Sequence, residues 1–173
     1  ITTVINTHTH GDHVSGNVEF PANVEFVAHV NTEANMKKMA PPAGATASIF
    51  AQHNGHGLPK RTFSDRLMLG SGNDRIELHY FGQGHTNGDA FVVFRELRTM
   101  HGGDIFASKG TPLLDMNNGG SGVRIGETLG KAAAGIKGVE TVIPGHAPVM
   151  TWADFVEVGE FNRAFLAAVQ ASI

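Results

Sequence analysis

The chain has 173 residues, 41% hydrophobic and 17% charged, which is the composition of an ordinary globular protein rather than of a disordered segment. The formal net charge is -3 and no basic run occurs, so no nucleic-acid partner is expected. Cysteine is absent, which excludes disulfides, thiolate metal ligands and cysteine nucleophiles. We expect residues 1–173 to form a single domain, and no apolar stretch approaches the roughly 20 residues that span a membrane.

The first third of the chain alternates apolar runs with polar connections. Residues 1–6 (ITTVIN) and 23–30 (NVEFVAHV) are rich in β-branched and aromatic residues, and this pattern predicts two strands. Residues 31–40 (NTEANMKKMA) are predicted to form a helix that ends before two prolines. Residues 41–62 are predicted to be a long loop, a kind of segment that is often functional.

Hairpins and then alternating strands and helices are predicted for the remaining two thirds. The sequence RLMLGSGNDRIELHYF has two strand-like runs around a Gly/Asn/Asp turn, and Thr151 and Asp154 have the spacing of a helix capping box. The predicted elements are a hairpin at 66–81, antiparallel strands at 90–94 and 98–104, a helix at 121–136, a strand at 141–143 and a helix at 151–170.

The loop after the first predicted strand reads NTHTHGDHVSGN and holds a cluster of metal-binding residue types. In an extended segment alternate side chains share a face, so His8 and His10 can point at one ion. Asp12 and His13 come after Gly11, where the chain can turn, so they can address a second ion beside the first.

Three further residues of these types follow predicted strands beside a glycine. They are His85 in GQGHTNGD, Asp104 in HGGDIF and His146 in IPGHAP. Strand ends that converge on one edge of a sheet commonly build active sites. Five histidines and two aspartates suffice for two ions with three ligands each and one shared carboxylate, which leaves open positions for catalysis. Zinc is the expected metal, and iron or manganese suits the same ligands.

In this order, HTHGDH, GHTNGD, GGD and PGH resemble the metallo-β-lactamase fold superfamily of hydrolases, over nearly the whole chain. The stretch beginning DMNNGGSG is most similar to its cyclase-like or glyoxalase-like branch. The resemblance implies an α+β fold, a four-layer αβ/βα sandwich. The superfamily normally has further strands before the first histidine loop, whereas this chain opens at Ile1 directly before it, so we expect an N-terminally truncated fragment.

The resemblance also implies a role for each site residue. It assigns the first metal to His8, His10 and His85, the second metal to Asp12, His13 and His146, and the bridging position to Asp104. Asp104 stands where one subclass of zinc-dependent lactamases has a cysteine, which argues against that subclass.

The expected function is hydrolysis by a dinuclear metal enzyme acting on a small molecule. A hydroxide shared by the metals would attack an ester, thioester or amide carbonyl, as in a β-lactam, lactone or thioester, with Asp12 as the catalytic residue that orients it. Two alternatives have the same fold: a mononuclear iron persulfide dioxygenase and a binding protein without catalysis. The sequence leaves the substrate, the oligomeric state and the localisation open.

The remaining histidines and Asp89 have less specific interpretations. Asp89 either hydrogen-bonds to a metal-binding histidine or fixes its own turn. His53 and His56 in the long loop are candidate substrate contacts. Three histidines within predicted strands are interpreted as packed or solvent-facing residues, namely His29, His79 and His101.

Overall fold

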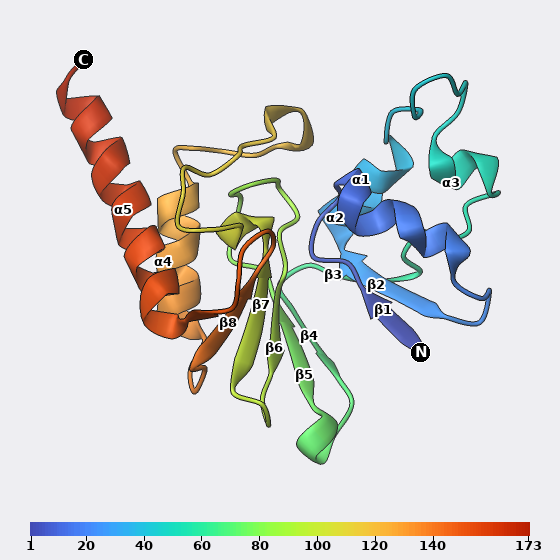
Figure 1. Cartoon of the computed structure of the whole chain (residues 1–173), viewed down its shortest axis with the longest axis horizontal. Coiled ribbons are helices and arrows are strands. Elements are labelled where there is room, and N and C mark those ends of the chain that lie inside the picture. Colours follow the sequence, from blue (N-terminus) through green and yellow to red (C-terminus); the bar gives the residue numbers. More distant parts are fainter.

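Two β-sheets lie between two groups of helices in the computed structural model, which describes residues 1–173 (Figure 1). The smaller sheet is parallel and has the order β1 (Thr3–Ile5), β2 (Glu25–His29) and β3 (Arg61–Phe63). The larger sheet consists, in spatial order, of β4 (Arg66–Leu69), β5 (Ile76–His79), β6 (Phe91–Phe94), β7 (Thr99–Gly103), β8 (Thr141–Pro144) and β9 (Met150–Thr151).

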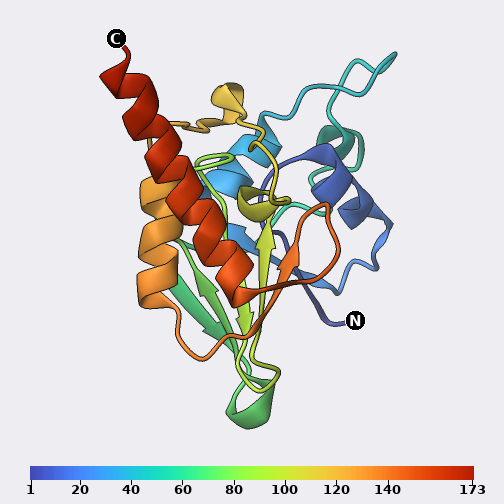
Figure 2. The same ribbon diagram turned by 60° about the vertical axis from the view of Figure 1, so that its left-hand side comes forward.

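The helices form two groups on opposite sides of the sheets. Figures 1 and 2 show the C-terminal pair of helices side by side over the larger sheet, and the short N-terminal helices next to the smaller sheet. The α-helices are α1 (Gly11–Val14), α2 (Val30–Lys37), α3 (Ile49–Gln52), α4 (Ile125–Gly135) and α5 (Trp152–Ala171). Four short 3-10 helices join them: η1 (Ser15–Glu19), η2 (Gly72–Asp74), η3 (Asp104–Phe106) and η4 (Met116–Asn118). No helix has the length and apolarity needed to cross a bilayer.

Three apolar clusters fill the spaces between these layers. The largest has 13 buried residues, among them Phe91, Leu129 and Phe155, and joins the larger sheet to α4 and α5. A second cluster lies between the two sheets and consists of Val27, Phe63, Leu78 and Ala90. A third joins α1, η1, α2 and α3 and consists of Val14, Val18, Met36 and Phe50. The predicted four-layer αβ/βα arrangement is therefore confirmed.

Most predicted elements are present, and the exceptions have local causes. The predicted loop at 41–62 is partly wrong, because it contains α3 and the start of β3. Ser48 caps α3 by accepting a hydrogen bond from the Ala51 backbone N–H at 3.3 Å, and Phe50 buries its ring in the third cluster. The helix predicted at 121–136 begins later, at Ile125, after a turn. The capping box of α5 is formed as expected, with Thr151 and Asp154 bonding each other's backbone N–H.

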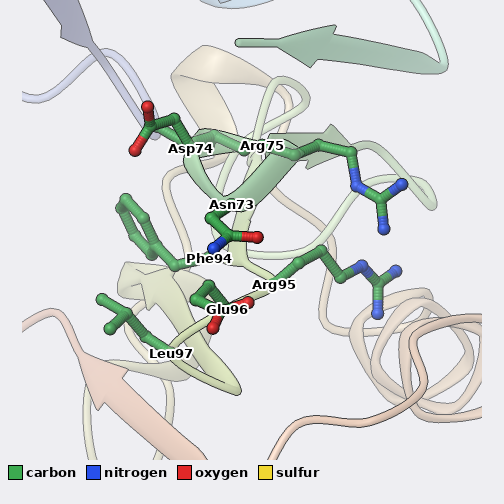
Figure 3. A pocket seen from close by; sticks show the side chains of 8 residues that line it. Asn73, Asp74, Arg75, Phe94, Arg95, Glu96 and Leu97 are labelled. Carbon is green, nitrogen blue, oxygen red and sulfur yellow. The ribbon is translucent and has the colours of Figure 1, made fainter. Parts of the chain in front are cut away.

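A buried carboxylate lies near the turn end of the β4–β5 hairpin. Glu77 is 2% exposed and receives hydrogen bonds from Arg66 at 2.9 Å and Arg95 at 2.6 Å. Arg75 lies 3.4 Å away, and His79 contacts the same carboxylate at 3.1 Å. Figure 3 shows Arg75 and Arg95 extending to the same side, beside a cavity of about 380 Å³ between the β4–β5 and β6–β7 turns. Arg95, helped by His79 and Arg66, lowers the pKa of Glu77 from its ordinary value of 4.5 to about 2.

Replacing Glu77 is expected to destabilise the fold in a pH-dependent way. Glu77→Gln removes the charge of a buried acceptor that binds the half-buried Arg95 and the more exposed Arg66, and should cost about 1–2 kcal/mol of unfolding free energy near pH 7. Because the folded-state pKa lies below the unfolded-state value, this carboxylate stabilises the fold fully above about pH 4.5 and loses its effect as the pH falls towards 2. The difference between wild type and variant should therefore shrink between pH 5 and pH 2, which urea titrations at a series of pH values would measure.

Glu96→Gln is the matched control, since Glu96 is exposed in the β6–β7 turn and forms no ion pair. Equal unfolding free energies for the Glu77 and Glu96 variants at pH 7 would contradict this account.

Candidate metal centre

Strand direction brings three of the predicted site residues to one edge of the larger sheet. β5 is antiparallel to β6, β6 is antiparallel to β7, and β7 is parallel to β8, so β5, β7 and β8 all run the same way. His85 follows β5, Asp104 begins η3 directly after β7, and His146 follows β8. The carboxyl ends of these strands therefore place the three side chains at the same edge.

The loop after β1 docks against this edge through Thr7. Its carbonyl oxygen accepts a hydrogen bond from the Ala90 backbone N–H at 2.8 Å, immediately before β6. On the other side, Gly103 lies so close that a Cβ there would come within 2.8 Å of the Thr7 side chain. Gly103 also has a φ of +55°, which a residue with a side chain rarely adopts. His8 and His10 belong to this docked loop, and Asp12 and His13 follow in α1.

The structure brings together all seven side chains that the sequence analysis singled out. The ligand atoms fall into two groups, each with every atom within 4.8 Å of the others: His8, His10, His85 and Asp104, and then Asp12, His13 and His146. In the second group, Asp12 Oδ2 lies 3.4 Å from His13 Nε2 and 3.2 Å from His146 Nε2. The first group is mostly buried and the second is more exposed.

Asp104 contacts both groups. Its Oδ2 atom lies 3.7 Å from Nε2 of His8 and 3.7 Å from Nε2 of His85. The same oxygen is 3.1 Å from His146 Nε2, and Oδ1 is 3.3 Å from His13 Nε2. A carboxylate in this position can be shared by two cations.

Two members of the donor set, His8 and Asp104, fit a divalent cation in their unpaired atoms and in their protonation states. His8 Nε2 and Asp104 Oδ1 are buried without any hydrogen-bond partner, which is costly unless a cation meets them. Burial, with the neighbouring His13 and His85, lowers the pKa of His8 to about 2, so its imidazole is neutral. Burial alone would raise the pKa of Asp104, but His13, His8 and His85 outweigh it and lower this pKa to about 2. Neutral imidazole and ionised carboxylate are the forms that bind metal.

Hydrogen bonds outside the cluster orient two of the imidazoles. His85 Nδ1 lies 2.7 Å from the carbonyl oxygen of Leu113, so it carries the proton and leaves Nε2 free for a metal. His8 Nδ1 lies 3.1 Å from the Thr7 hydroxyl, which likewise leaves Nε2 directed at the cluster.

Asp115 is a site-adjacent residue that the sequence analysis did not single out. Its Oδ2 lies 2.7 Å from His10 Nε2, although the two residues are 105 positions apart. Burial opposes ionisation of Asp115, but hydrogen bonds from Asn118 and His10 lower its pKa to about 2. Nothing in the spacing of DMNNGG connects it with His10, so only the folded structure identifies this contact.

Asp89 and the other histidines have structural contacts. Asp89 accepts hydrogen bonds from the Thr86 backbone N–H at 2.9 Å and from its hydroxyl at 2.6 Å, so it fixes its own turn. His56 Nε2 donates to the Phe20 carbonyl oxygen at 2.8 Å, and the exposed His53 ends α3. The strand histidines make packing or backbone contacts as expected: His29 stacks on Tyr80, His79 on Phe81, and His101 bonds to Ile143.

An open cavity of about 620 Å³ adjoins the first group of side chains. His10 and Asp115 belong to its wall, and amide, hydroxyl and ammonium groups line much of the rest, namely those of Asn35, Asn117, Asn118, Ser15 and Lys38. The cavity in Figure 3 lies at the opposite ends of β5 and β6, away from the cluster.

The fold is a four-layer αβ/βα sandwich, and histidine and aspartate side chains that could hold metal ions gather from loops at one sheet edge. Residues 1–149 match the family model of the metallo-beta-lactamase superfamily, and the chain belongs to this superfamily. A search of curated protein sequences gave no match.

Solved metallo-beta-lactamases have the same fold. The crystal structure of the DIM-1 metallo-beta-lactamase matches with a TM-score of 0.71 and 20% identity, over 92% of this chain and 68% of that one. The TMB-1 structure matches with a TM-score of 0.74 and 17% identity, over 95% of this chain and 68% of that one. The IND-7 metallo-beta-lactamase structure matches with a TM-score of 0.68 and 20% identity, over 92% of this chain and 68% of that one. At these identities the likeness concerns the fold.

Gly145→Ala is expected to weaken metal binding, because a Cβ at this position would lie 1.8 Å from Asp104 Oδ1. The Asp104 carboxylate would have to move away from both groups, and metal affinity should fall about tenfold or more. Metal content after dialysis, measured by mass spectrometry beside a circular dichroism spectrum, checks this.

Gly16→Ala is the control, since nothing lies within 4 Å of a Cβ at that glycine. A folded Gly145 variant that retains the wild-type metal content would show that Asp104 does not depend on this close approach.

Proposed function

We propose that the chain is a metal-dependent hydrolase that binds two divalent ions, with zinc expected, and cleaves a carbonyl ester, thioester or amide. The observation that carries this proposal is the position of Asp104 between the two groups of ligand-type side chains, in contact with four imidazoles. Membership of the superfamily supports the same conclusion.

The residues would divide into two ligand sets. His8, His10 and His85 would hold one ion, Asp12, His13 and His146 would hold the other, and Asp104 would serve both. When bound, a pair of divalent cations supplies a water molecule with a pKa near 7 and polarises a carbonyl oxygen. The loops that carry the ligands are fixed by strands, so the side chains need little rearrangement to bind.

Asp12 is the residue we assign to proton handling. It is 58% exposed, whereas Asp104 is 7% exposed, so Asp12 is the carboxylate of the cluster that solvent and a substrate can reach. Its Oδ2 atom lies between His13 and His146, and from there it can orient an attacking water and accept its proton.

The cavity beside His10 is the place we assign to the substrate. It shares His10 and Gly11 with the metal-binding loop, so a carbonyl group lying at its inner end would be next to the ligand groups. Its amide and ammonium groups suit a small molecule with polar substituents near the scissile bond. The solved structures of the same fold are named as metallo-beta-lactamases, which makes β-lactams the first compounds to test, with lactones and thioesters beside them.

Chelation should abolish turnover. The protein would be assayed against a β-lactam, a lactone and a thioester before and after dialysis with a chelator, and zinc would then be added back. We expect about two metal ions per chain and recovery of activity with zinc. Undiminished turnover in chelator would refute the hydrolase proposal, and one iron per chain with oxygen uptake would favour the dioxygenase alternative.

Asp12→Asn should lower kcat by about 10²- to 10⁴-fold, because it removes the group assigned to proton transfer. The second ligand set should also lose affinity, so that metal content falls from about two ions towards about one. The matched control is Asp65→Asn, an exposed aspartate in the β3–β4 connection outside both ligand groups. An Asp12 variant with the kcat and metal content of the control would remove Asp12 from the mechanism.

A further inference from the structure

We propose that Asp115 is a positioning residue that fixes the His10 imidazole in the form with the proton on Nε2, so that Nδ1 presents its lone pair to the metal. The inference rests on the metal centre proposed above. It assigns a role to a residue that belongs to neither ligand group.

The two nitrogens of His10 face different surroundings. Nδ1 lies 2.9 Å from Nε2 of His85, inside the first ligand group. Nε2 lies 2.7 Å from Asp115 Oδ2, outside that group. Since the two nitrogens lie on different sides of the ring, Asp115 lies across the imidazole from the place an ion would take. Asp115 therefore acts through His10 and is not a further ligand.

The contacts of Asp115 require its carboxylate to accept every hydrogen bond. Oδ1 accepts from the backbone N–H groups of Asn117 at 3.0 Å and Asn118 at 3.2 Å. Oδ2 accepts from the Asn118 side-chain amide at 2.6 Å. No acceptor is among these partners, so the carboxyl group has no place to donate a proton. His10 must then be the donor in the remaining contact, and a neutral imidazole that donates through Nε2 has its lone pair on Nδ1.

The backbone holds Asp115 against the first ligand group. The Asp115 N–H donates to the carbonyl oxygen of His85 at 2.9 Å, and the Asp115 carbonyl accepts from the Gly120 N–H at 2.8 Å. Gly120 approaches so closely that a Cβ there would lie 2.3 Å from the His85 carbonyl oxygen. Leu113, two residues earlier, accepts the proton of His85 Nδ1 at 2.7 Å. One short segment, residues 113–115, thus directs two imidazoles of the same group through their outward nitrogens.

Asp115→Asn tests this role because it keeps the size of the side chain and changes what it offers His10. The amide oxygen would remain opposite the backbone donors of Asn117 and Asn118, which leaves the amide NH₂ facing His10 Nε2. His10 would then have to accept through Nε2 and carry its proton on Nδ1, the nitrogen needed for metal. We expect the affinity of the first ion to fall about 10- to 100-fold, measured by competition for zinc with a chromophoric chelator.

The protonated nitrogen of His10 can be read directly by ¹⁵N nuclear magnetic resonance of the imidazole, in metal-free and zinc-loaded protein. Wild type should have the proton on Nε2, and Asp115→Asn should move it to Nδ1. A variant that keeps the proton on Nε2 and the wild-type zinc affinity would overturn the proposal.

Asn118→Ala is the control that separates tautomer selection from support of the loop. It removes the amide contact to Asp115 Oδ2 but leaves the carboxylate in place, so His10 should keep its proton on Nε2 and zinc affinity should change less than about tenfold. An equal loss of affinity in both variants without any change at His10 would mean that Asp115 only shapes the loop, and the proposal would fail. If wild type binds no zinc, the metal centre is wrong, and the spectrum of the metal-free protein still decides whether Asp115 sets the form of His10.

Discussion

The burial of Asp104 is the constraint around which the rest of the site is arranged. A carboxylate that is 7% exposed needs donors or positive charge nearby, because water no longer solvates it. Histidines from three separate loops surround it, yet Oδ1 accepts no hydrogen bond, and His8 Nε2 beside it is also without a partner. Gly145 closes the remaining side, with no room for a Cβ. The protein therefore holds a polar cluster in which two buried atoms have no hydrogen-bond partner, and a divalent cation would satisfy them.

The larger sheet stabilises the buried polar groups because it keeps them at its two ends, with an apolar core between them. Between them, Leu78, Val93, Met100 and Val142 are fully buried and join the sheet to the layers on either side. At one end of β5 Glu77 is compensated by arginines, and past the other end His85 joins the cluster of histidine and aspartate side chains. Because the strands cannot shift without breaking the core, the loops that follow β5, β7 and β8 have fixed starting points.

The sequence predicted the elements and features with short-range signals. Alternation, capping and turn residues predicted β4–β5, β6–β7 and α5, and the spacing of His8 to His13 predicted a metal-binding loop. The structure shows the grouping of all seven side chains, while their roles as ligands stay predictions. Two features that depend on distant partners were not predicted. The short helix α3 depends on burial of Phe50, and Asp115 meets His10 across 105 positions without any local pattern.

Residues 113–118 contribute both to the histidine and aspartate cluster and to the wall of the neighbouring cavity. Leu113 and Asp115 are bonded to imidazoles of the cluster, and Asp115, Asn117 and Asn118 are part of the cavity wall. Asn117 and Asn118 also hold the Asp115 carboxylate through their backbone amides. In the evolution of such a protein, substrate preference and metal retention would be genetically linked at this loop. Exchanges at Lys38, an exposed residue of the same cavity that is outside this loop, would be free of that linkage.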